Sequence, residues 1–404
     1  MSLKRMVEIA FMYALVSVPL PRLQAQDQRA QFRPPLSKSY FGVNIGYINY
    51  PFSNAHLEPG YQAGNINVPH PAVRLVLYGY HVNKYISAQI TYMRPVNWVQ
   101  YNNINGAPTS NSVWMNIAGI SAKARLPLSS KFSIYGEGGY NLVTRHGFFL
   151  DNDPHPVVKD VSYSSFLLGA GIEFHVDKKW DLLFSAALTP RSSANKQPHT
   201  IYFGAGFNFN MHPMPEEKVK RNSDGKYIFP VNLLQLGYTT NALGYGANKF
   251  VSAGKIPVFW GGNVRVEHGF SIQYQRNIFH GRKVFSLDWG ANISIWRTNK
   301  KKENFFTLSV FPVIRFHFLH SPGFDLYFNY SVAGPAYISK VRLDDLETGR
   351  HFTFHDVMGM GAFIGKQRKM NFELKVAHYS NGNIFPQNEG VMIPLSFNFG
   401  YTFD

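Results

Sequence analysis

Long runs of alternating apolar and polar residues constrain the fold of this chain more than any other feature. In NVRVEHGFSIQYQ (263–275), FSLDWGANISIW (285–296) and FDLYFNYSV (324–332), almost every second residue is apolar. Because successive side chains on a β-strand point to opposite faces, this alternation predicts strands with one apolar and one polar face. The chain is therefore expected to be all-β.

The length of these runs favours strands that cross a membrane. Alternation alone also fits a soluble β-sandwich, which has one apolar face and one wet face. Soluble strands usually span about 5 to 6 residues, however, and many of these runs reach about ten, the length of a tilted membrane-crossing strand. Aromatic residues also gather near the ends of the runs, as interfacial girdles require. They include Tyr40, Phe41, Tyr78, Tyr80, Trp296, Tyr401 and Phe403.

Both ends of the chain fit export to the outer membrane. Two basic residues precede an apolar run at 9–20, and RLQA ends in the small residue Ala25, so residues 1–25 are predicted to be a signal peptide. The last residues, FNFGYTFD (397–404), place their aromatic side chains on one face. They resemble the last strand that bacterial outer-membrane barrels present to the barrel assembly machinery, which is therefore an expected partner during biogenesis.

Composition and charge exclude several classes of protein. After the N-terminus no stretch reaches the roughly 18 to 20 consecutive apolar residues of a transmembrane helix. The chain has no Cys, so its fold does not rely on disulfides. Its net charge is +16, but the Lys and Arg residues are scattered, and an exported chain rarely meets nucleic acid. A phosphate-rich partner at a membrane surface fits the charge, and solubilising loop charge is the alternative.

The predicted strands divide into two sets of about eight. One set precedes residue 212 and the other follows residue 226, with the charged, proline-containing HPMPEEKVKRNSDGK between them. About eight strands close a small barrel, and an even number places both ends of each barrel in the periplasm. We therefore expect tandem outer-membrane β-barrels at 26–211 and 227–404, joined by a periplasmic linker at 212–226. A single barrel of about sixteen strands is the alternative.

The second-last predicted strand carries two reactive polar groups on its apolar face. In FELKVAHYSNG (372–382), His378 and Ser380 alternate in line with Phe, Leu and Val, whereas Tyr379 belongs to the other face. In a barrel with periplasmic ends this strand runs outward, so both groups are expected at the outer rim, facing lipid. Polar groups are costly in hydrocarbon, and keeping them there favours a surface that acts on a lipid.

The residues around this strand resemble the lipid A 3-O-deacylase (PagL-type) family. The resemblance is carried by FHDVMGMGAFIG (354–365), HYSN (378–381), the downstream PQNEG (386–390) and the final aromatic strand. It spans roughly residues 225–404 and does not cover the first half of the chain. It implies an eight-stranded outer-membrane hydrolase that removes an ester-linked acyl chain from lipopolysaccharide and needs no cofactor.

The resemblance also implies roles for individual residues. Ser380 is similar to the family nucleophile and His378 to its general base, because a free hydroxyl is too weak a nucleophile without a base. Asn381 and the backbone N–H of Gly382 match the positions expected to bind the oxyanion. The family pattern then requires a carboxylate to orient the His, and Met392 occupies that position.

Glu389 is the candidate for the missing carboxylate. It lies in the turn before the last strand, and the alternation assigns it to the outward face if that strand extends upward. Loss of an orienting carboxylate slows a triad by about 10⁴-fold, so a weakened or inactive enzyme is the alternative outcome.

The sequence thus predicts an outer-membrane ester hydrolase with lipid A, lipopolysaccharide and the surrounding outer-membrane lipids as partners. The alternative is a non-catalytic barrel that acts as an anchor or adhesin and carries a degenerate site. The 15 His residues show no metal-binding spacing such as HExxH, so no metal is predicted. A diffusion porin would need a wider lumen than about eight strands provide.

Charged residues on the polar faces of the second set of strands are predicted to fill a narrow lumen. They are Glu267, Asp288, Asp325, Arg265 and Arg315.

Overall fold

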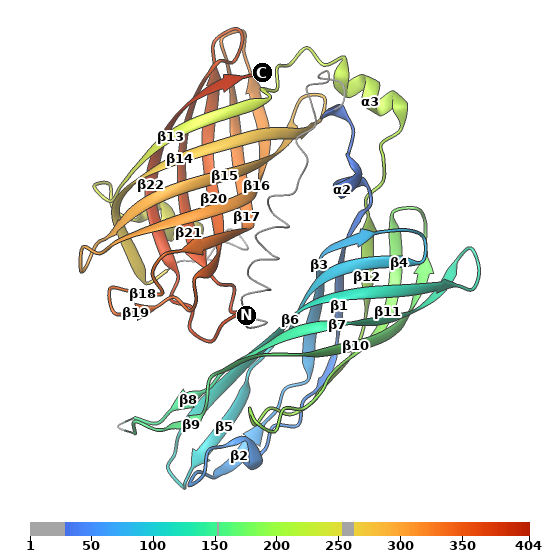
Figure 1. The fold of residues 1–404 in the computed structure, drawn as a ribbon, viewed down its shortest axis with the longest axis vertical. Coiled ribbons are helices and arrows are strands. Elements are labelled where there is room, and N and C mark those ends of the chain that lie inside the picture. Colours follow the sequence, from blue (N-terminus) through green and yellow to red (C-terminus); the bar gives the residue numbers. More distant parts are fainter. Residues whose placement is uncertain (1–28, 152, 253–261) are drawn as a thin grey trace, which may run out of the picture.

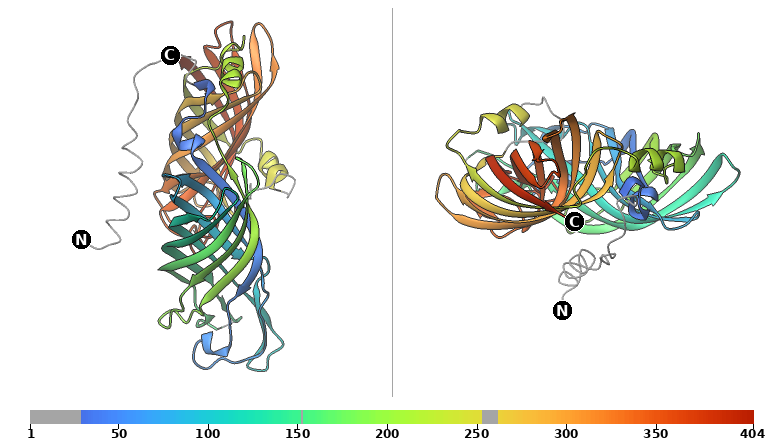
Figure 2. Two further views of the ribbon diagram at one scale, coloured as in Figure 1. Left: turned by 90° about the vertical axis from the view of Figure 1, so that its right-hand side faces the viewer. Right: turned by 90° about the horizontal axis from the view of Figure 1, so that it is seen from above.

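The computed structural model describes residues 29–151, 153–252 and 262–404, and the predicted signal peptide at 1–25 lies outside this part of the chain. The described residues form two closed antiparallel barrels of eight strands each. The two barrels lie side by side, with their long loops at corresponding ends (Figures 1 and 2). The predicted fold class is therefore confirmed, and the single wide barrel does not form.

Strands of the N-terminal barrel follow the segments predicted before residue 212. Pairing of β6 with β7 closes the barrel, and the short strands β2 and β5 extend one edge of it beyond the rim. The barrel strands are β1 (Ser39–Asn49), β3 (Pro71–His81), β4 (Ile86–Pro95), β6 (Ser110–Pro127), β7 (Phe132–His146), β10 (Val161–His175), β11 (Trp180–Thr189) and β12 (Thr200–Asn210). The loops carry β2 (Ala63–Asn67), β5 (Val99–Ile104), β8 (Phe148–Phe149) and β9 (Pro156–Val158).

The C-terminal barrel closes by pairing its first strand, β13, with its last strand, β22. Residues 253–261 lie outside the described residues, and the strand that contains the predicted run 263–275 begins at Val264. The strands are β13 (Asn232–Thr240), β14 (Val264–His280), β15 (Phe285–Thr298), β16 (Asn304–His320), β17 (Phe324–Ile338), β20 (Phe352–Ile364), β21 (Met370–Ser380) and β22 (Val391–Phe403).

Helices are short and lie outside the barrel walls. Helix α3 (Glu216–Ser223) occupies the segment between the barrels, α2 (Pro34–Ser37) precedes β1, and α4 (Gly246–Ser252) follows β13. One long loop of the C-terminal barrel carries the two-stranded hairpin β18 (Arg342–Leu343) and β19 (Leu346–Glu347). No described helix has the length and apolar character needed to cross a membrane.

Ion pairs fill the interior of the C-terminal barrel, while its outer wall is apolar. Arg315 pairs with Asp288, and Arg368 Nε lies 2.6 Å from Asp325 Oδ2. All four side chains are buried, as the predicted charged lumen requires for Asp288, Asp325 and Arg315. On the outside, Phe270 is 63% exposed, as a residue of a membrane-facing wall should be.

Arg265 and Glu267 do not face the lumen, so that part of the prediction was wrong. Arg265 is exposed, and Glu267 Oε1 lies 2.7 Å from Lys302 Nζ in a half-exposed ion pair. Val264 and Val266 point inward instead, because the loop end of this lumen is an apolar cluster that includes Trp296 and Tyr379. Near the loops, the polar face of a strand is therefore the outer face.

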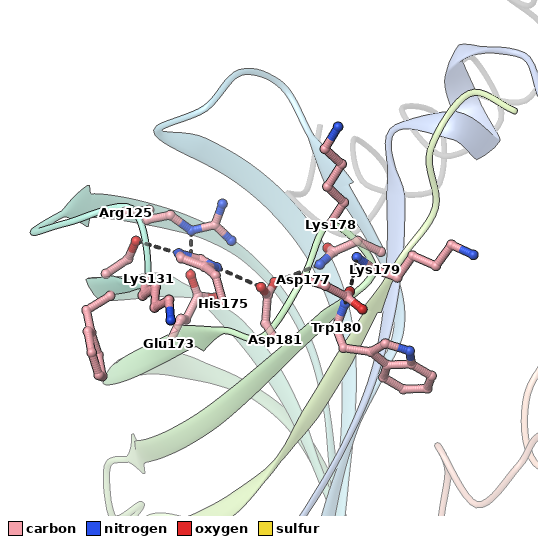
Figure 3. Close-up of polar contacts among 12 residues, drawn as sticks. Arg125, Lys131, Glu173, His175, Asp177, Lys178, Lys179, Trp180 and Asp181 are labelled. Atoms are coloured by element: carbon pink, nitrogen blue, oxygen red, sulfur yellow. Dashed lines mark hydrogen bonds and ion pairs between the residues drawn. The ribbon is translucent and has the colours of Figure 1, made fainter. Parts of the chain in front are cut away.

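Opposite the long loops, polar side chains close the N-terminal barrel (Figure 3). Glu173 binds both Lys123 and Arg125, and His175 Nδ1 lies 2.6 Å from Asp181 Oδ1. The C-terminal barrel has a similar His–Asp pair, in which His320 Nδ1 at the end of β16 lies 2.9 Å from Asp325 Oδ1 at the start of β17. Both barrel interiors are thus packed with side chains.

Breaking the lumen pair should destabilise the C-terminal barrel strongly. Arg315→Ala leaves the Asp288 carboxylate buried without its cation, so we expect the free energy of unfolding in detergent micelles to fall by about 3–5 kcal/mol. Lys301→Ala removes a half-exposed loop pair with Asp345 and should leave the free energy of unfolding almost unchanged. Urea titration of both variants measures the difference, and equal losses would contradict the expectation.

Candidate active site

Strand β21 carries His378 and Ser380 on the outer wall of the C-terminal barrel. The residue between them, Tyr379, points into the lumen, where its hydroxyl lies 2.9 Å from Thr307 Oγ1 and its ring stacks on His355. Because side chains alternate along a strand, the imidazole and the hydroxyl face outward. Ser380 is the last residue of the strand, so both groups lie at the rim, where the barrel meets its loops.

An acidic residue on the neighbouring strand holds the imidazole. Asp356 of β20 is the direct cross-strand partner of His378, and its Oδ2 lies 3.2 Å from His378 Nδ1. Its other oxygen, Oδ1, accepts the backbone N–H of Ala333 at 2.6 Å. Asp356 is 3% exposed and His378 is 1% exposed, so solvent screens this pair little.

A β-bulge in β17 supplies the Ala333 N–H. The register between β17 and β20 shifts between Ser331 and Gly334, and Ala333 has a φ of +55°. A residue with a side chain is uncommon in this left-handed region, and such strain collects at functional sites. The bulge turns one backbone donor away from the strand ladder and toward the Asp356 carboxylate.

Glu389 is not brought to the imidazole, so the structure does not support the role expected for it. Its carboxylate accepts a hydrogen bond from Asn263 Nδ2, and its own N–H donates to the carbonyl of Glu347. Met392 is the cross-strand partner of His378 on β22, as Asp356 is on β20. The carboxylate thus stands on the opposite side of His378 from the position that the family pattern requires.

Asn381 organises the loop after β21. Its side-chain Nδ2 donates to the carbonyls of Thr348 and Gln387, and its backbone N–H donates to Asn388 Oδ1 at 2.8 Å. Both amide hydrogens are therefore engaged inside the protein. The structure gives Asn381 a scaffolding position rather than a donor aimed at the outer wall.

Gly382 lies two residues after Ser380, in the turn that follows β21. Its N–H donates to no acceptor in the described part of the chain. Its φ of +61° is left-handed, and a Cβ atom there would approach the Phe354 ring to 3.3 Å. Phe354 is in turn the cross-strand partner of Ser380. Glycine is therefore the residue that this turn accepts.

Ser380 and His378 share the outer face of β21, two residues apart. Nδ1 of His378 is turned toward Asp356, so Nε2 is the ring nitrogen on the side away from that carboxylate.

Apolar side chains continue the same outer face below the site. Val376 and Met358 are buried there by Val251 of helix α4, with Leu395 packed alongside. Asn248 of that helix donates from Nδ2 to the carbonyl of Ile393 at 2.8 Å, which fixes the helix on the wall. The polar groups of the site therefore adjoin an apolar surface.

The loop after Ser380 is anchored to the outer wall of the N-terminal barrel. Backbone carbonyls in this loop accept hydrogen bonds from Asn116 Nδ2 on β6, at 2.7 Å, and from Thr144 Oγ1 on β7. Asn116 is 2% exposed and Thr144 is fully buried, although both point away from their own lumen. The accepting carbonyls are those of Asn383 and Ile384.

A carboxylate of the N-terminal barrel completes the anchor. Gln387 Nε2 donates to Asp160 Oδ2 at 2.8 Å, and Asp160 Oδ1 accepts the N–H of Gly147. Burial alone would raise the pKa of Asp160, but the hydrogen bonds from His146 and Gly147 lower it overall. Asp160 is therefore charged at neutral pH, and the bond from Gln387 is charge-assisted.

The sequence did not reveal Asp356 or the anchoring residues. Asp356 lies inside the quoted FHDVMGMGAFIG, but its meeting with His378 depends on the register of β20 against β21. Asn116 and Thr144 are ordinary polar residues within strands until the second barrel is placed against them. Among the described residues, no group of three or more His, Asp or Glu is placed to hold a metal ion.

Comparison with known proteins separates the two halves of the chain. Residues 12–209 match the model of the outer membrane protein beta-barrel domain, and residues 268–402 match the model of lipid A 3-O-deacylase (PagL). The C-terminal half is thus PagL-type, and the protein is one of the bacterial outer membrane. No curated protein matches the chain.

Solved outer-membrane barrels align with less than half of the chain. The outer membrane enzyme PagL is 15% identical, covers 42% of this chain and 99% of its own, and has a TM-score of 0.32. Neisserial surface protein A is 15% identical over 43% of this chain and 98% of its own, with a TM-score of 0.30. Ail, the attachment invasion locus protein of Yersinia pestis, is 16% identical over 42% of this chain and 97% of its own, with a TM-score of 0.26.

Removing the anchoring side chains should loosen the loop at 381–390. We expect the double variant Asn116→Leu and Thr144→Val to raise amide hydrogen exchange in this loop on the order of tenfold, because two hydrogen bonds are lost. Ser164→Val changes an exposed residue of β10 and is the matched control. Unchanged exchange in the double variant would contradict the anchoring.

Proposed function

We propose that the C-terminal barrel hydrolyses an ester-linked acyl chain of lipid A at the outer rim of the membrane. One observation carries this proposal: an outward-facing His378, held by Asp356 at 3.2 Å, adjoins Ser380 on the same face. Ion pairs inside the barrel fill its lumen, but an acid–base pair on the outer wall cannot have that structural role. The match of residues 268–402 to the deacylase family supports the same reading.

Attack by Ser380 begins the reaction. Its Oγ adds to the ester carbonyl carbon while His378 Nε2 takes the hydroxyl proton. The Asp356 carboxylate holds the resulting imidazolium and keeps Nδ1 protonated, as the acid of a triad does. The Ala333 N–H keeps that carboxylate in place.

The Gly382 N–H stabilises the tetrahedral oxyanion. Preorganised backbone donors are effective in a water-poor site because they need no reorganisation during the reaction. Asn381 contributes by fixing the turn that presents this donor, through its bonds to the carbonyls of Thr348 and Gln387. Its role is thus positioning rather than direct contact with the oxyanion.

Collapse of the intermediate breaks the ester bond. The sugar oxygen leaves with the proton that His378 carries, and the acyl chain stays on Ser380. Water then attacks this acyl-serine, His378 accepts its proton, and the fatty acid departs as Ser380 is restored. The apolar outer wall, where Met360 and Phe399 are exposed, suits the acyl chain, so substrate enters laterally from the lipid. No cofactor is needed.

Loss of the nucleophile should abolish the reaction. We expect outer membranes that carry the wild-type chain to contain lipid A lighter by one acyl chain, and Ser380→Ala to leave its mass unchanged. Mass spectrometry of extracted lipid A measures both. Identical lipid A masses with no acyl loss would favour the alternative, an outer-membrane anchor or adhesin with a degenerate site.

Amide substitutions can distinguish whether Asp356 or Glu389 is the acid that orients His378. Asp356→Asn keeps the shape but removes the charge that holds the imidazolium, so kcat should fall by up to about 10⁴-fold. Glu389→Gln should leave kcat within about twofold, because its carboxylate binds Asn263 and not His378. Release of fatty acid in detergent micelles is the measurement, and the reverse pattern would restore Glu389 as the acid.

A further inference from the structure

A pocket on the outer rim of the N-terminal barrel faces the same side of the membrane as the candidate active site. Its volume is about 400 Å³. Arg94, at the loop end of β4, forms one wall, and its guanidinium lies 4.4 Å from the centre of the Trp98 ring. The pocket is lined by Asn67, Pro69, Arg94, Val96, Asn97, Trp98 and Gln100.

We propose that this pocket binds the phosphorylated sugar headgroup of the glycolipid that the C-terminal barrel cleaves. The inference rests on the proposed function for the identity of the lipid. It assigns the N-terminal barrel a part in substrate binding, which neither family match describes.

The chemistry of the lining fits a phosphorylated sugar. Arg94 forms no ion pair with a carboxylate in the described part of the chain, and its Nε makes only a 3.3 Å contact with the carbonyl of Pro95. A guanidinium that stacks on an aromatic ring presents its remaining N–H groups as a fork, which matches phosphate oxygens. The amides of Asn67, Asn97 and Gln100 offer both donors and acceptors for sugar hydroxyls.

The pocket lies next to the anchored loop of the other barrel. Tyr92 precedes Arg94 by two residues on the same outward face of β4, and its hydroxyl lies 3.5 Å from the carbonyl of Gly382. Two strand residues span about 7 Å, so a headgroup held by Arg94 places its lipid beside the Gly382 turn. Gly382 itself is two residues beyond Ser380.

The pocket also lies at the level of lipid headgroups. Ile90, four residues earlier on β4, is 45% exposed and belongs to the apolar outer wall. Four residues of strand rise about 13 Å, and less along a tilted axis, which puts Arg94 just beyond the apolar wall. Trp98 and Trp114, with ring centres 6.4 Å apart, mark the interface there.

Binding can be measured without turnover by using the full-length Ser380→Ala protein in detergent micelles. The probes are bis-phosphorylated lipid A and the same lipid A after enzymatic dephosphorylation. We expect tighter binding of the phosphorylated form, and Arg94→Gln in the same background should weaken it about tenfold while leaving the dephosphorylated form unaffected. Arg191→Gln removes an equal charge from the opposite side of the same barrel and should change neither affinity.

Three outcomes decide the proposal. The proposal is overturned if Ser380→Ala proteins with and without Arg94→Gln bind phosphorylated lipid A with equal affinity. Heat-modifiable migration in gels must show that the variant barrel is folded. Displacement of lipid A by inorganic phosphate at equal concentration would also overturn it, since the occupant would then be a free anion. Arg94-dependent binding in a protein whose wild-type form cleaves nothing would uphold this pocket and refute the hydrolase.

Discussion

Closure of each sheet into a barrel is the constraint on which the rest of this structure depends. In lipid every backbone N–H and C=O must be satisfied within the protein, and a closed sheet does this without leaving an edge. Closure also fixes the direction of each side chain, because a strand residue must point either into the lumen or out of the wall. With Tyr379 in the lumen, His378 and Ser380 have only the outer wall.

The same closure gives every strand residue two lateral neighbours. His378 has Asp356 as its cross-strand partner on one side and Met392 on the other. A carboxylate on either neighbouring strand can reach the imidazole. The acid can therefore come from a residue before the His in the sequence, on β20, or from one after it, on β22. Here the acid comes from β20, and the bulge in β17 supplies the donor that holds it.

Much of the fold was predictable because alternation is a local signal. The runs at 263–275 and 285–296 contain their own evidence for strands, and the boundary near 212–226 follows from composition. The prediction that Arg265 and Glu267 face the lumen was wrong because alternation shows that the two faces of a strand differ, but not which face is inside. Near the loops the lumen is apolar, and the assignment of the two faces inverts.

The site was predictable only where it lies on one strand. His378 and Ser380 are two residues apart, so parity sets their common face, and the family resemblance suggested their roles. The contacts of Asp356 and Asn381 depend on strand register or on loop conformation, which no local pattern contains. To predict the anchoring residues one must also know how the two barrels pack together, because these residues join barrels that are far apart in the sequence.

Asn116 and Thr144 show that the two barrels are not independent modules. Each faces away from its own lumen and finds its hydrogen-bond acceptor only in a loop more than two hundred residues later in the chain. Inserted alone, the first barrel would present these side chains unpaired at the edge of the hydrocarbon, where an unsatisfied polar group is costly. The polar side chains on this part of the first wall are therefore satisfied only when the second barrel lies beside it.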